Sequence, residues 1–318
     1  MAKRQALKNV NNASWLFGHP VLRADGNSTA YWARPTVSPY NQKGGGWMPC
    51  LHAGVQDGND WAAVYIPVNE MPVTAFTDAQ WAYYMTSTQT MGANMVIWVH
   101  DADDFDKRAE ITQAGNIATL EKTAGWNAHE FDQTVTQMFF YGEGTTGTDL
   151  TAGTRYTWDQ FQADPLFKDW VIYRITFEMG WEASGTFDQV WIAEIKLNGI
   201  PIPLKPGEAD KQPVQIYATG AAAIAHTVSP KTPFKLLSHL THLNTAATQQ
   251  TLTVTIDAGR LANVYDQLLV SEAMAGITDL ARTWDGGLDC KEDDEIDTAW
   301  TNTDTRTYGL TVSIQTVF

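Results

Sequence analysis

Residues 170–204 read WVIYRITFEMGWEASGTFDQVWIAEIKLNGIPIPL, and this stretch decides the fold that the sequence predicts. β-branched and aromatic residues alternate over residues 170–179 and again over residues 190–197, on either side of a loop rich in Gly, Ser and Asp. A period of two on both sides of a short loop is typical of an antiparallel pair of strands. We expect one face of the pair to pack into a core and the other to face solvent or a partner. The charged side chains on that second face are Arg174, Glu178, Glu194 and Lys196.

The composition favours large β-sandwich cores. The chain has 318 residues, which suggests two domains at roughly 100–200 residues each. A hydrophobic content of 44% excludes global disorder. With 13 Trp, 11 Tyr and 12 Phe, the chain is rich in the large flat side chains that fill the space between packed sheets. We therefore expect an all-β fold of two β-sandwich (jelly-roll-like) domains, joined by a Pro-rich linker and preceded by a short N-terminal arm.

The domain boundary is expected where prolines gather. Residues 198–213 read NGIPIPLKPGEADKQP, with four prolines and two glycines, which suits a semi-rigid linker better than a strand interior. We expect an N-terminal arm over residues 1–14, a first sandwich over 15–204, a linker over 205–213 and a second sandwich over 214–318.

In the first domain, the pattern predicts strands of uneven clarity. The expected strands are 29–33, 46–52, 61–68 and 94–100, and residues 131–140 alternate imperfectly. Residues 78–86 fit either a helix or a strand, and residues 157–167 either a helix or a loop. Residues 102–110 fit one or two helical turns, because Asp101, Asp103 and Asp104 suit a helix N-terminus.

In the second domain, short strands recur at regular spacing, which indicates another β-sandwich. Turn signals such as Asp285-Gly286-Gly287 separate them. The expected strands are 214–218, 222–228, 234–237, 251–256, 265–270, 277–283, 295–301 and 308–316.

The net charge of the chain limits the classes of partner that it can bind. The net charge is −15, from 36 acidic and 21 basic residues, which argues against nucleic-acid binding because phosphates require clustered Lys and Arg. Acidic charge maintains solubility and could also meet a basic partner surface. The N-terminal arm is basic, with Lys3, Arg4 and Lys8. It either contacts a neighbouring acidic surface or is a frayed terminus.

The expected compartment is a reducing cytoplasm. The first residues contain no apolar stretch of the kind found in secretion signals, and no run approaches the ~18 apolar residues of a membrane span. The two cysteines, Cys50 and Cys290, form no disulfide framework in a chain of this length. Cys50 is expected to be a small buried residue.

Residues 295–300, EIDTAW, carry the clearest pattern for an enzyme. They resemble the E-x-D-x-x-E strand of laminarinase-type glycoside hydrolases, in which carboxylates on one strand face cleave the glycosidic bond. Glu295 and Asp297 would share a face, but Trp300 stands at the third carboxylate position. We therefore predict no catalytic residues and treat hydrolysis as the weakest alternative.

Two other patterns contain residue types that bind metal ions. His239 and His242 could supply half of a site, but no further ligand completes it, and we interpret them as polar residues on an exposed turn. Asp101, Asp103 and Asp104 do not fit the spacing of an EF-hand. An irregular Ca²⁺ site at these aspartates stays open as an alternative, and no other cofactor is expected.

Four tryptophans lie in or beside predicted loops and strand ends and could stack on sugar rings if exposed. The alternative is that they belong to the core. These candidates for glycan binding are Trp47, Trp61, Trp126 and Trp181.

Two resemblances add expectations about function. Residues 170–204 resemble the last strand pair of concanavalin A-like (lectin/glucanase, laminin G-type) jelly rolls, in which a strand of the form W-x-x-Y-x-I-x-F precedes one ending in I-x-L-N-G. Members of that superfamily bind glycans, cleave them or act as structural modules. Residues 251–280 and 294–318 are similar to small β modules in structural proteins of tailed bacteriophages.

Together these resemblances imply a non-enzymatic structural protein of a phage virion, most simply one that decorates or stabilises the capsid and presents a lectin-like domain outwards. The alternative is a carbohydrate-binding, lectin-like protein or tail-attached adhesin. The implied partners are the major capsid protein or another virion protein, a second and third copy of the chain in a dimer or trimer, and a glycan. The implied location is the virion, after synthesis in the host cytoplasm.

Overall fold

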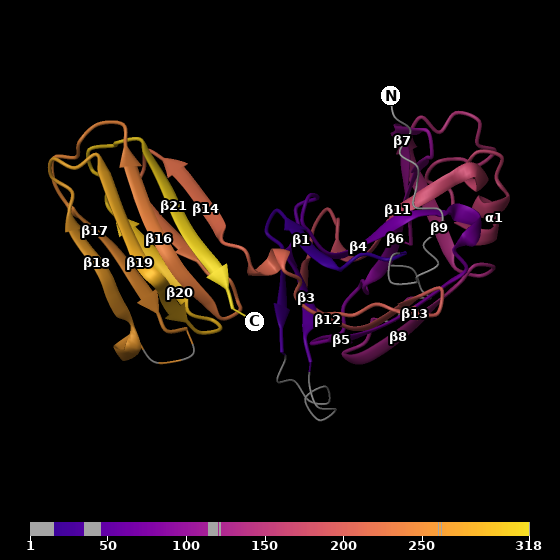
Figure 1. Cartoon of the computed structure of the whole chain (residues 1–318), viewed down its shortest axis with the longest axis horizontal. Helices are drawn as coiled ribbons and strands as arrows, with labels where there is room; N and C mark the ends of the chain where they lie inside the picture. Colours follow the sequence, from indigo (N-terminus) through magenta and orange to yellow (C-terminus); the bar gives the residue numbers. More distant parts are fainter. Residues whose placement is uncertain are drawn as a thin grey trace. The chain divides into compact units, whose positions relative to one another are not determined.

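The computed structural model describes residues 16–34, 46–113, 120, 122–259, 261 and 263–317. The chain divides into two compact units, Met1–Lys205 and Pro206–Phe318. Both are built almost entirely of antiparallel β-strands arranged in two sheets each (Figure 1). The predicted all-β fold class of β-sandwiches is confirmed. The expected N-terminal arm lies outside the described residues.

The first unit packs a seven-stranded sheet against a six-stranded one. The larger sheet runs, in spatial order, through β1 (Val21–Asp25), β4 (Trp61–Pro72), β11 (Trp170–Gly180), β6 (Asn94–Asp101), β7 (Asp104–Thr112), β9 (Gln137–Glu143) and β10 (Tyr156–Thr157). The smaller sheet runs through β2 (Thr29–Ala33), β3 (Met48–Val55), β12 (Thr186–Leu197), β5 (Asp78–Met85) and β8 (Gly125–Asp132), with β13 (Ile200–Pro201) paired to β12. Short helical segments are η3 (Val73–Ala75), α1 (Trp158–Ala163) and η4 (Phe167–Asp169).

Strands β11 and β12, which the sequence suggested as one antiparallel pair, do not pair with each other. β11 lies between β4 and β6, and β12 lies between β3 and β5, in the facing sheet. The alternation identified both strands, and it gave the buried face of β11 correctly after the β-bulge between Ile172 and Arg174 but not before it, where Trp170 and Ile172 lie in the core. The loop between the two strands crosses the sandwich instead of closing a hairpin. Each strand therefore contributes its apolar face to the same core from opposite sides.

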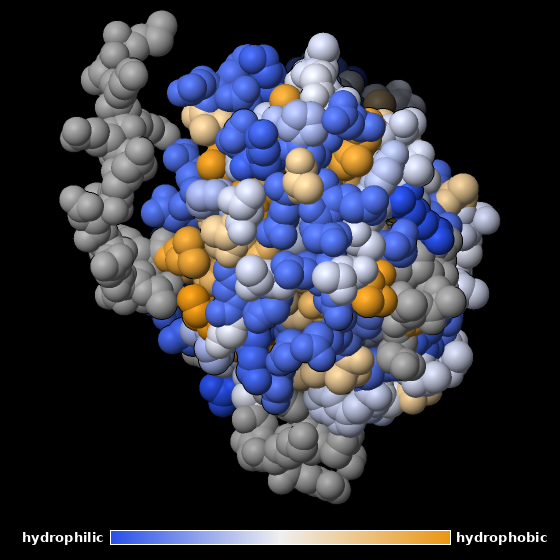
Figure 2. All heavy atoms as spheres, turned by 90° about the vertical axis from the view of Figure 1, so that its right-hand side faces the viewer, coloured by the Kyte–Doolittle hydropathy of each residue, from blue (hydrophilic) through white to orange (hydrophobic). Residues whose placement is uncertain are grey.

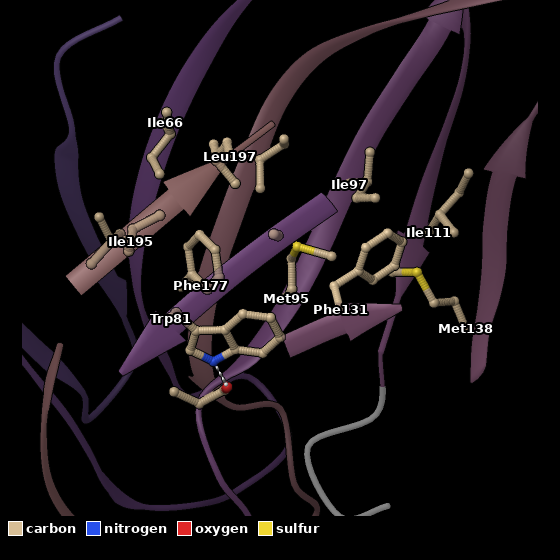
Figure 3. Close-up of a cluster of buried hydrophobic side chains, with 14 of the residues drawn as sticks. Ile66, Trp81, Met95, Ile97, Ile111, Phe131, Met138, Phe177, Ile195 and Leu197 are labelled. Carbon is tan, nitrogen blue, oxygen red and sulfur yellow. Dashed lines mark hydrogen bonds between the residues drawn. The ribbon is translucent and has the colours of Figure 1, made fainter. Parts of the chain in front are cut away.

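The core between these sheets is aromatic and closely packed. Figure 3 shows side chains from both sheets in this cluster: Phe177, Met95 and Ile97 from the larger, and Trp81, Ile195 and Leu197 from the smaller. The ring centroids of Trp81 and Phe177 are 5.2 Å apart. The indole N–H of Trp81 donates to the carbonyl of Ala93 at 2.9 Å, so this buried ring leaves no donor unsatisfied.

Three local predictions in the first unit were wrong. Residues 102–110 form most of strand β7 rather than helical turns, because ladder bonds to β6 and β9 outweigh a weak helix-start signal. Residues 131–140 belong to two strands, since Asp132 closes a turn by accepting the N–H of Thr134 at 2.7 Å. In the proline-rich stretch 198–213, which was expected to suit a linker better than a strand, residues 200–201 form strand β13 against β12. The open choice at residues 78–86 resolves as strand β5.

The second unit packs two four-stranded sheets. One consists of β14 (Val214–Gly220), β21 (Tyr308–Thr316), β16 (Phe234–Leu243) and β19 (Asp279–Cys290). The other consists of β15 (Ile224–Val228), β20 (Glu295–Trp300), β17 (Thr251–Asp257) and β18 (Gln267–Ala273), and the short helical turns are η5 (Ala209–Lys211) and η6 (Asn263–Tyr265). The predicted turn at Asp285-Gly286-Gly287 lies inside β19 instead. Both glycines have positive φ, which gives an irregular strand rather than a reversal.

The surface is mainly hydrophilic where Figure 2 shows it, with hydrophobic residues in small separate patches. This pattern is ordinary for a soluble fold and agrees with the net charge of −15. Within the described residues, no helix is long and apolar enough to cross a membrane. Cys50 and Cys290 are free and buried, and burial raises the pKa of each thiol to about 12.

His239 is a core residue of the second unit, so its prediction as part of an exposed turn was wrong. Strand β16 continues through it, and its side chain is 0% exposed. Its Nε2 lies 3.0 Å from the hydroxyl of Thr298, while its Nδ1 has no hydrogen-bond partner among the described residues. Burial is the main cause that lowers the pKa of His239 to about 4, and the nearby His226 lowers it further. His242, on the same strand, is exposed and contacts Asp279 at 2.6 Å.

The second unit should therefore lose stability in acid. Between pH 6.5 and pH 4 the unfolded chain binds a proton at His239 that the folded chain does not, so the free energy of unfolding falls as pH falls, by up to about 3 kcal/mol. The variant His239→Gln should flatten this slope, whereas His242→Gln should keep it. Urea unfolding of the full chain, followed by NMR signals of Val254 and Val312, measures the slope. Equal slopes in all three proteins would contradict the assignment.

Candidate functional site

The outer face of the seven-stranded sheet carries an unusual set of side chains. Along β4, Ala62, Val64 and Ile66 belong to the core, so Trp61 and Tyr65 point to the opposite side. The same alternation on the neighbouring strands directs further aromatic and charged side chains outwards. We call this set the outer face: Trp61, Tyr65, Asn94, Trp98, Glu110, Thr112, Phe139, Tyr141, Arg174, Thr176 and Glu178, with Trp181 at the end of β11.

A row of parallel rings crosses one part of the outer face. The ring centroids of Trp181 and Trp61 are 5.7 Å apart with an interplanar angle of 9°. Trp61 and Tyr65 are 5.8 Å apart with an angle of 5°. Trp181 is 53% exposed, and Trp61 and Tyr65 are half-buried. The row therefore offers aromatic surface to solvent at one end and is held by packing at the other.

The backbone at Gly180 brings Trp181 into this row. Gly180 has φ of 116°, and a Cβ there would lie 2.3 Å from the carbonyl oxygen of Asp60, so only glycine fits. The N–H of Trp181 donates to that same carbonyl at 2.8 Å. The buried carboxylate of Asp60 accepts the backbone N–H groups of Asn27 at 2.5 Å and Asp57 at 2.6 Å, which lower its pKa. This hydrogen-bonded corner fixes where the exposed indole lies.

Arg174 continues the row as a cation between two rings. Its guanidinium carbon lies 4.3 Å from the ring centroid of Tyr65 and 4.0 Å from that of Trp98. The indole N–H of Trp98 donates to the hydroxyl of Thr176 at 3.0 Å, which orients the ring. Arg174 therefore makes cation–π contacts with one ring on each neighbouring strand, which help to hold these aromatic side chains in place.

Two carboxyl groups occupy the adjoining part of the outer face. Glu178 is only 7% exposed, and its pKa is raised to about 8, first by burial and then by the charge of Glu110. Arg174 and a hydrogen bond from Asn94 offset part of this rise. Burial also raises the pKa of Glu110, whose Oε1 accepts the hydroxyl of Thr112 at 3.3 Å. Glu178 is therefore largely neutral at pH 7, as both a donor and an acceptor of hydrogen bonds.

The outer face is hollowed beside these carboxyl groups. One cavity of about 360 Å³, which we call the acidic hollow, is lined by Met91, Asn94, Glu110, Thr112, Phe139, Tyr141, Glu178, Gly180, Trp181 and Glu182. A second cavity of about 320 Å³ is lined by Trp98, Arg108, Ala109, Glu110, Tyr141, Gly142 and Glu143. Glu110 and Tyr141 border both, so the two hollows adjoin. Volumes of this size can hold a sugar-sized ligand.

The structure brings together only two of the four tryptophans that the sequence suggested for glycan binding. Trp61 and Trp181 meet on the outer face. Trp126 packs against Tyr84 at 5.6 Å on the other sheet. Trp47 precedes β3 and has the guanidinium of Arg34 4.7 Å from its ring. The predicted partner contacts at Lys3, Arg4 and Lys8 lie outside the described residues.

Several residues of the outer face were not recognised as site residues from the sequence. Arg174 and Glu178 were identified as outward charges, but nothing indicated that Glu110 on another strand stands near them. Trp98 was assigned to a buried strand because apolar neighbours surround it. The alternation of apolar and polar residues along β6 and β7 indicates that the side chains of Trp98 and Glu110 point outwards. It does not indicate which residues of neighbouring strands lie opposite each other.

The residues suggested for glycoside hydrolysis and for Ca²⁺ binding form contacts with other side chains of the protein. Glu295 forms an ion pair with Lys231 at 3.2 Å, and Asp297 accepts the hydroxyl of Thr227 at 2.5 Å. They share the outward face of β20, as expected, yet neither lines a hollow described above. The aspartates weighed for Ca²⁺ are engaged as well, since Lys107 lies 3.8 Å from Asp101 and 3.4 Å from Asp104. Among the residues that the structure describes, no three His, Cys, Asp or Glu side chains could jointly hold a metal ion.

The raised pKa of Glu178 predicts the pH dependence of the first unit. Between pH 4.5 and pH 8 the folded chain keeps a proton that the unfolded chain releases, so the free energy of unfolding falls as pH rises. Glu178→Gln removes this pH dependence. At pH 9 its free energy of unfolding should exceed that of the wild type by several kcal/mol, at about 1.4 kcal/mol per pKa unit, and at pH 4.5 the variant should show no such advantage. Urea unfolding followed by tryptophan fluorescence measures this, with the outward Glu194→Gln as control. A wild-type slope retained in Glu178→Gln would disprove the assignment.

Comparison with known proteins yields distant structural similarity alone. The sequence matches no protein-family model and no curated protein. A family 11 carbohydrate-binding module from Clostridium thermocellum, in complex with a β-1,3-1,4-mixed-linked tetrasaccharide, is similar at 10% identity and a TM-score of 0.34, over 58% of this chain and 91% of that one. A tandem CBM22 domain from Paenibacillus barcinonensis Xyn10C aligns at 10% identity and 0.28, over 93% of each chain. A triple jelly roll protein from the turret of an archaeal virus aligns at 8% and 0.25, over 92% of this chain and 60% of that one. These scores are too low to transfer a function.

Proposed function

We propose that the first unit binds carbohydrate on the outer face of its seven-stranded sheet, without cleaving it. The observation that carries the proposal is the row of parallel rings from Trp181 through Trp61 to Tyr65, beside hollows lined by carboxyl and amide groups. Sugar rings present C–H faces that pack on aromatic rings and hydroxyl groups that need hydrogen-bond partners at their edges. Both requirements are met on this face.

The geometry favours an extended glycan over a single sugar. The rings lie in succession, and the acidic hollow and its neighbour adjoin them, so contacts are available along a line. Trp181 belongs to both the row and the acidic hollow. One sugar could therefore pack on the exposed ring of Trp181 and enter the hollow, while the next sugars contact the exposed parts of Trp61 and Tyr65.

Binding without cleavage follows from the state of the carboxyl groups. A retaining glycosidase needs one ionised nucleophile and one protonated acid, about 5–5.5 Å apart. Here burial raises the pKa of both Glu110 and Glu178, so the ionised form that a nucleophile needs is less favoured at each of them than in an exposed glutamate. A pair in this state supplies hydrogen bonds to hydroxyl groups rather than a nucleophile.

Substitution of the exposed rings tests this function. Trp61→Ala and Trp181→Ala should each weaken glycan binding at least about fivefold, since ring stacking contributes on the order of 1 kcal/mol. Trp126→Ala, on the other sheet, should not weaken it. A glycan array with the full chain identifies a ligand, calorimetry measures the affinities, and a reducing-sugar assay checks for cleavage. Silence across the array, or loss of binding in Trp126→Ala alone, would refute the proposal.

A second candidate function is a structural role in a phage virion, in which the second unit attaches to a capsid or other virion protein. The observation that favours attachment is the exposure of large apolar residues on or beside edge strands of this unit. Tyr217 on β14 is 68% exposed, Leu268 on β18 is 61% exposed and Val264 is 83% exposed. Edge strands with exposed apolar side chains are common sites of association. A dimer or trimer, with contacts from Lys3, Arg4 and Lys8, belongs to the same hypothesis.

Self-association tests this second candidate. Light scattering on the full chain should show a dimer or trimer, and Tyr217→Lys or Leu268→Lys should shift it to a monomer, because a buried lysine charge is costly at an interface. Val135→Lys, at an exposed position of the first unit, serves as control. A wild-type protein that stays monomeric at every concentration would count against attachment through these strands.

A further inference from the structure

We propose that the acidic hollow binds a protonated amino group, so that the glycan recognised on the outer face contains amino sugars with free amines. This inference rests on the proposed function and specifies its ligand class. It is carried by the charges and rings that line the hollow, which suit an organic cation better than a neutral sugar.

The charge of the hollow is one-sided. Glu110, Glu178 and Glu182 line it, and none of its lining residues is Lys, Arg or His. Glu178 is more than nine-tenths buried yet forms no ion pair within the described part of the chain. A hydrogen bond from the side chain of Asn94 lowers its pKa, and a carboxyl group has further acceptor positions beyond this one. A buried carboxyl group with this little compensation would be stabilised by a ligand that donates several hydrogen bonds and carries positive charge.

The walls of the hollow are also suited to a cation. Phe139, Tyr141 and Trp181 line it, and the rings of Phe139 and Tyr141 lie 5.3 Å apart in an edge-to-face arrangement. Aromatic faces attract ammonium groups through their quadrupole, most strongly where water is excluded. Carboxyl groups and aromatic rings that line the same hollow form the combination that binds organic cations in proteins.

Arg174, whose charge lowers the pKa of Glu178, already has aromatic partners outside the hollow. Arg174 lies between Tyr65 and Trp98 and does not line the acidic hollow. It offsets the rise in the pKa of Glu178 but does not cancel it, because the pKa still reaches about 8. An ammonium group in the hollow would supply the positive charge that lowers the pKa of Glu110 and Glu178, so that their ionised forms are stabilised when the ligand binds.

The ring row distinguishes an amino sugar from the side chain of a lysine. Trp181 forms one wall of the hollow and at the same time stacks on Trp61. A sugar whose amine enters the hollow can therefore continue as a chain over Trp61 and Tyr65. A lysine side chain would fill the hollow and leave this row without contacts.

Calorimetry with matched oligosaccharides tests the inference on the full chain at pH 6. The probes are a fully deacetylated chitosan hexamer, its fully N-acetylated counterpart and a neutral β-glucan oligomer of equal length. The deacetylated hexamer should bind at least tenfold more tightly than the other two, and added salt should reduce this advantage. Glu178→Gln and Glu110→Gln should abolish the preference while their folded state is verified by thermal unfolding. Glu194→Gln, on the other sheet, should retain it.

The outcomes separate this inference from the proposed function. Equal binding of all three oligomers, or a preference that survives in Glu178→Gln and Glu110→Gln, would overturn the inference and leave carbohydrate binding intact. Failure of every glycan to bind, here and on the array, would overturn both. A lysine-rich peptide is the last probe. If it binds as tightly as the deacetylated hexamer, and if this binding is lost in Glu178→Gln, the hollow binds a protein amine, and the assignment to a sugar is overturned.

Discussion

The opposite direction of successive side chains along β11 is the constraint on which the first unit depends. Ile175 and Phe177 point into the core, and Arg174, Thr176 and Glu178 therefore point outwards. A shift of one residue in register would bury the charges and expose the apolar side chains, so core packing and the outer face are determined together. The large aromatic core between the sheets stabilises the arrangement, and it holds a poorly solvated carboxyl group on the opposite side of the same strand.

The two units carry buried titratable groups with opposite consequences. Glu178 in the first unit is an acid whose burial favours its neutral form, so that unit is destabilised as pH rises. His239 in the second unit is a base whose burial favours its neutral form, so that unit is destabilised as pH falls. His239 lies between two sheets and lines none of the hollows described, whereas Glu178 lines a cavity on the surface. A ligand that enters this cavity could therefore compensate for the burial of Glu178, whereas His239 has no such access.

The candidate site was only partly predictable. Trp61 and Trp181 could be selected because each lies at a predicted strand end, and the alternation identified Glu178 as an outward charge. Their association depends on Gly180, whose positive φ turns the chain so that Trp181 stacks on Trp61. The approach of Glu110 to Glu178 depends on strand order, with β6 between β11 and β7. No pattern within a single strand contains that order.

The sequence by itself determined that the chain is all-β and which faces of most strands are apolar, because hydrophobic alternation is a local property read within five to ten residues. It misplaced elements where a weak local signal competed with pairing, as at residues 102–110 and His239. The tertiary structure alone decided that β11 and β12 belong to facing sheets, and that side chains from five strands converge on one outer face. Strand pairing joins segments far apart in the chain, and its energy depends on neighbours that no local pattern specifies.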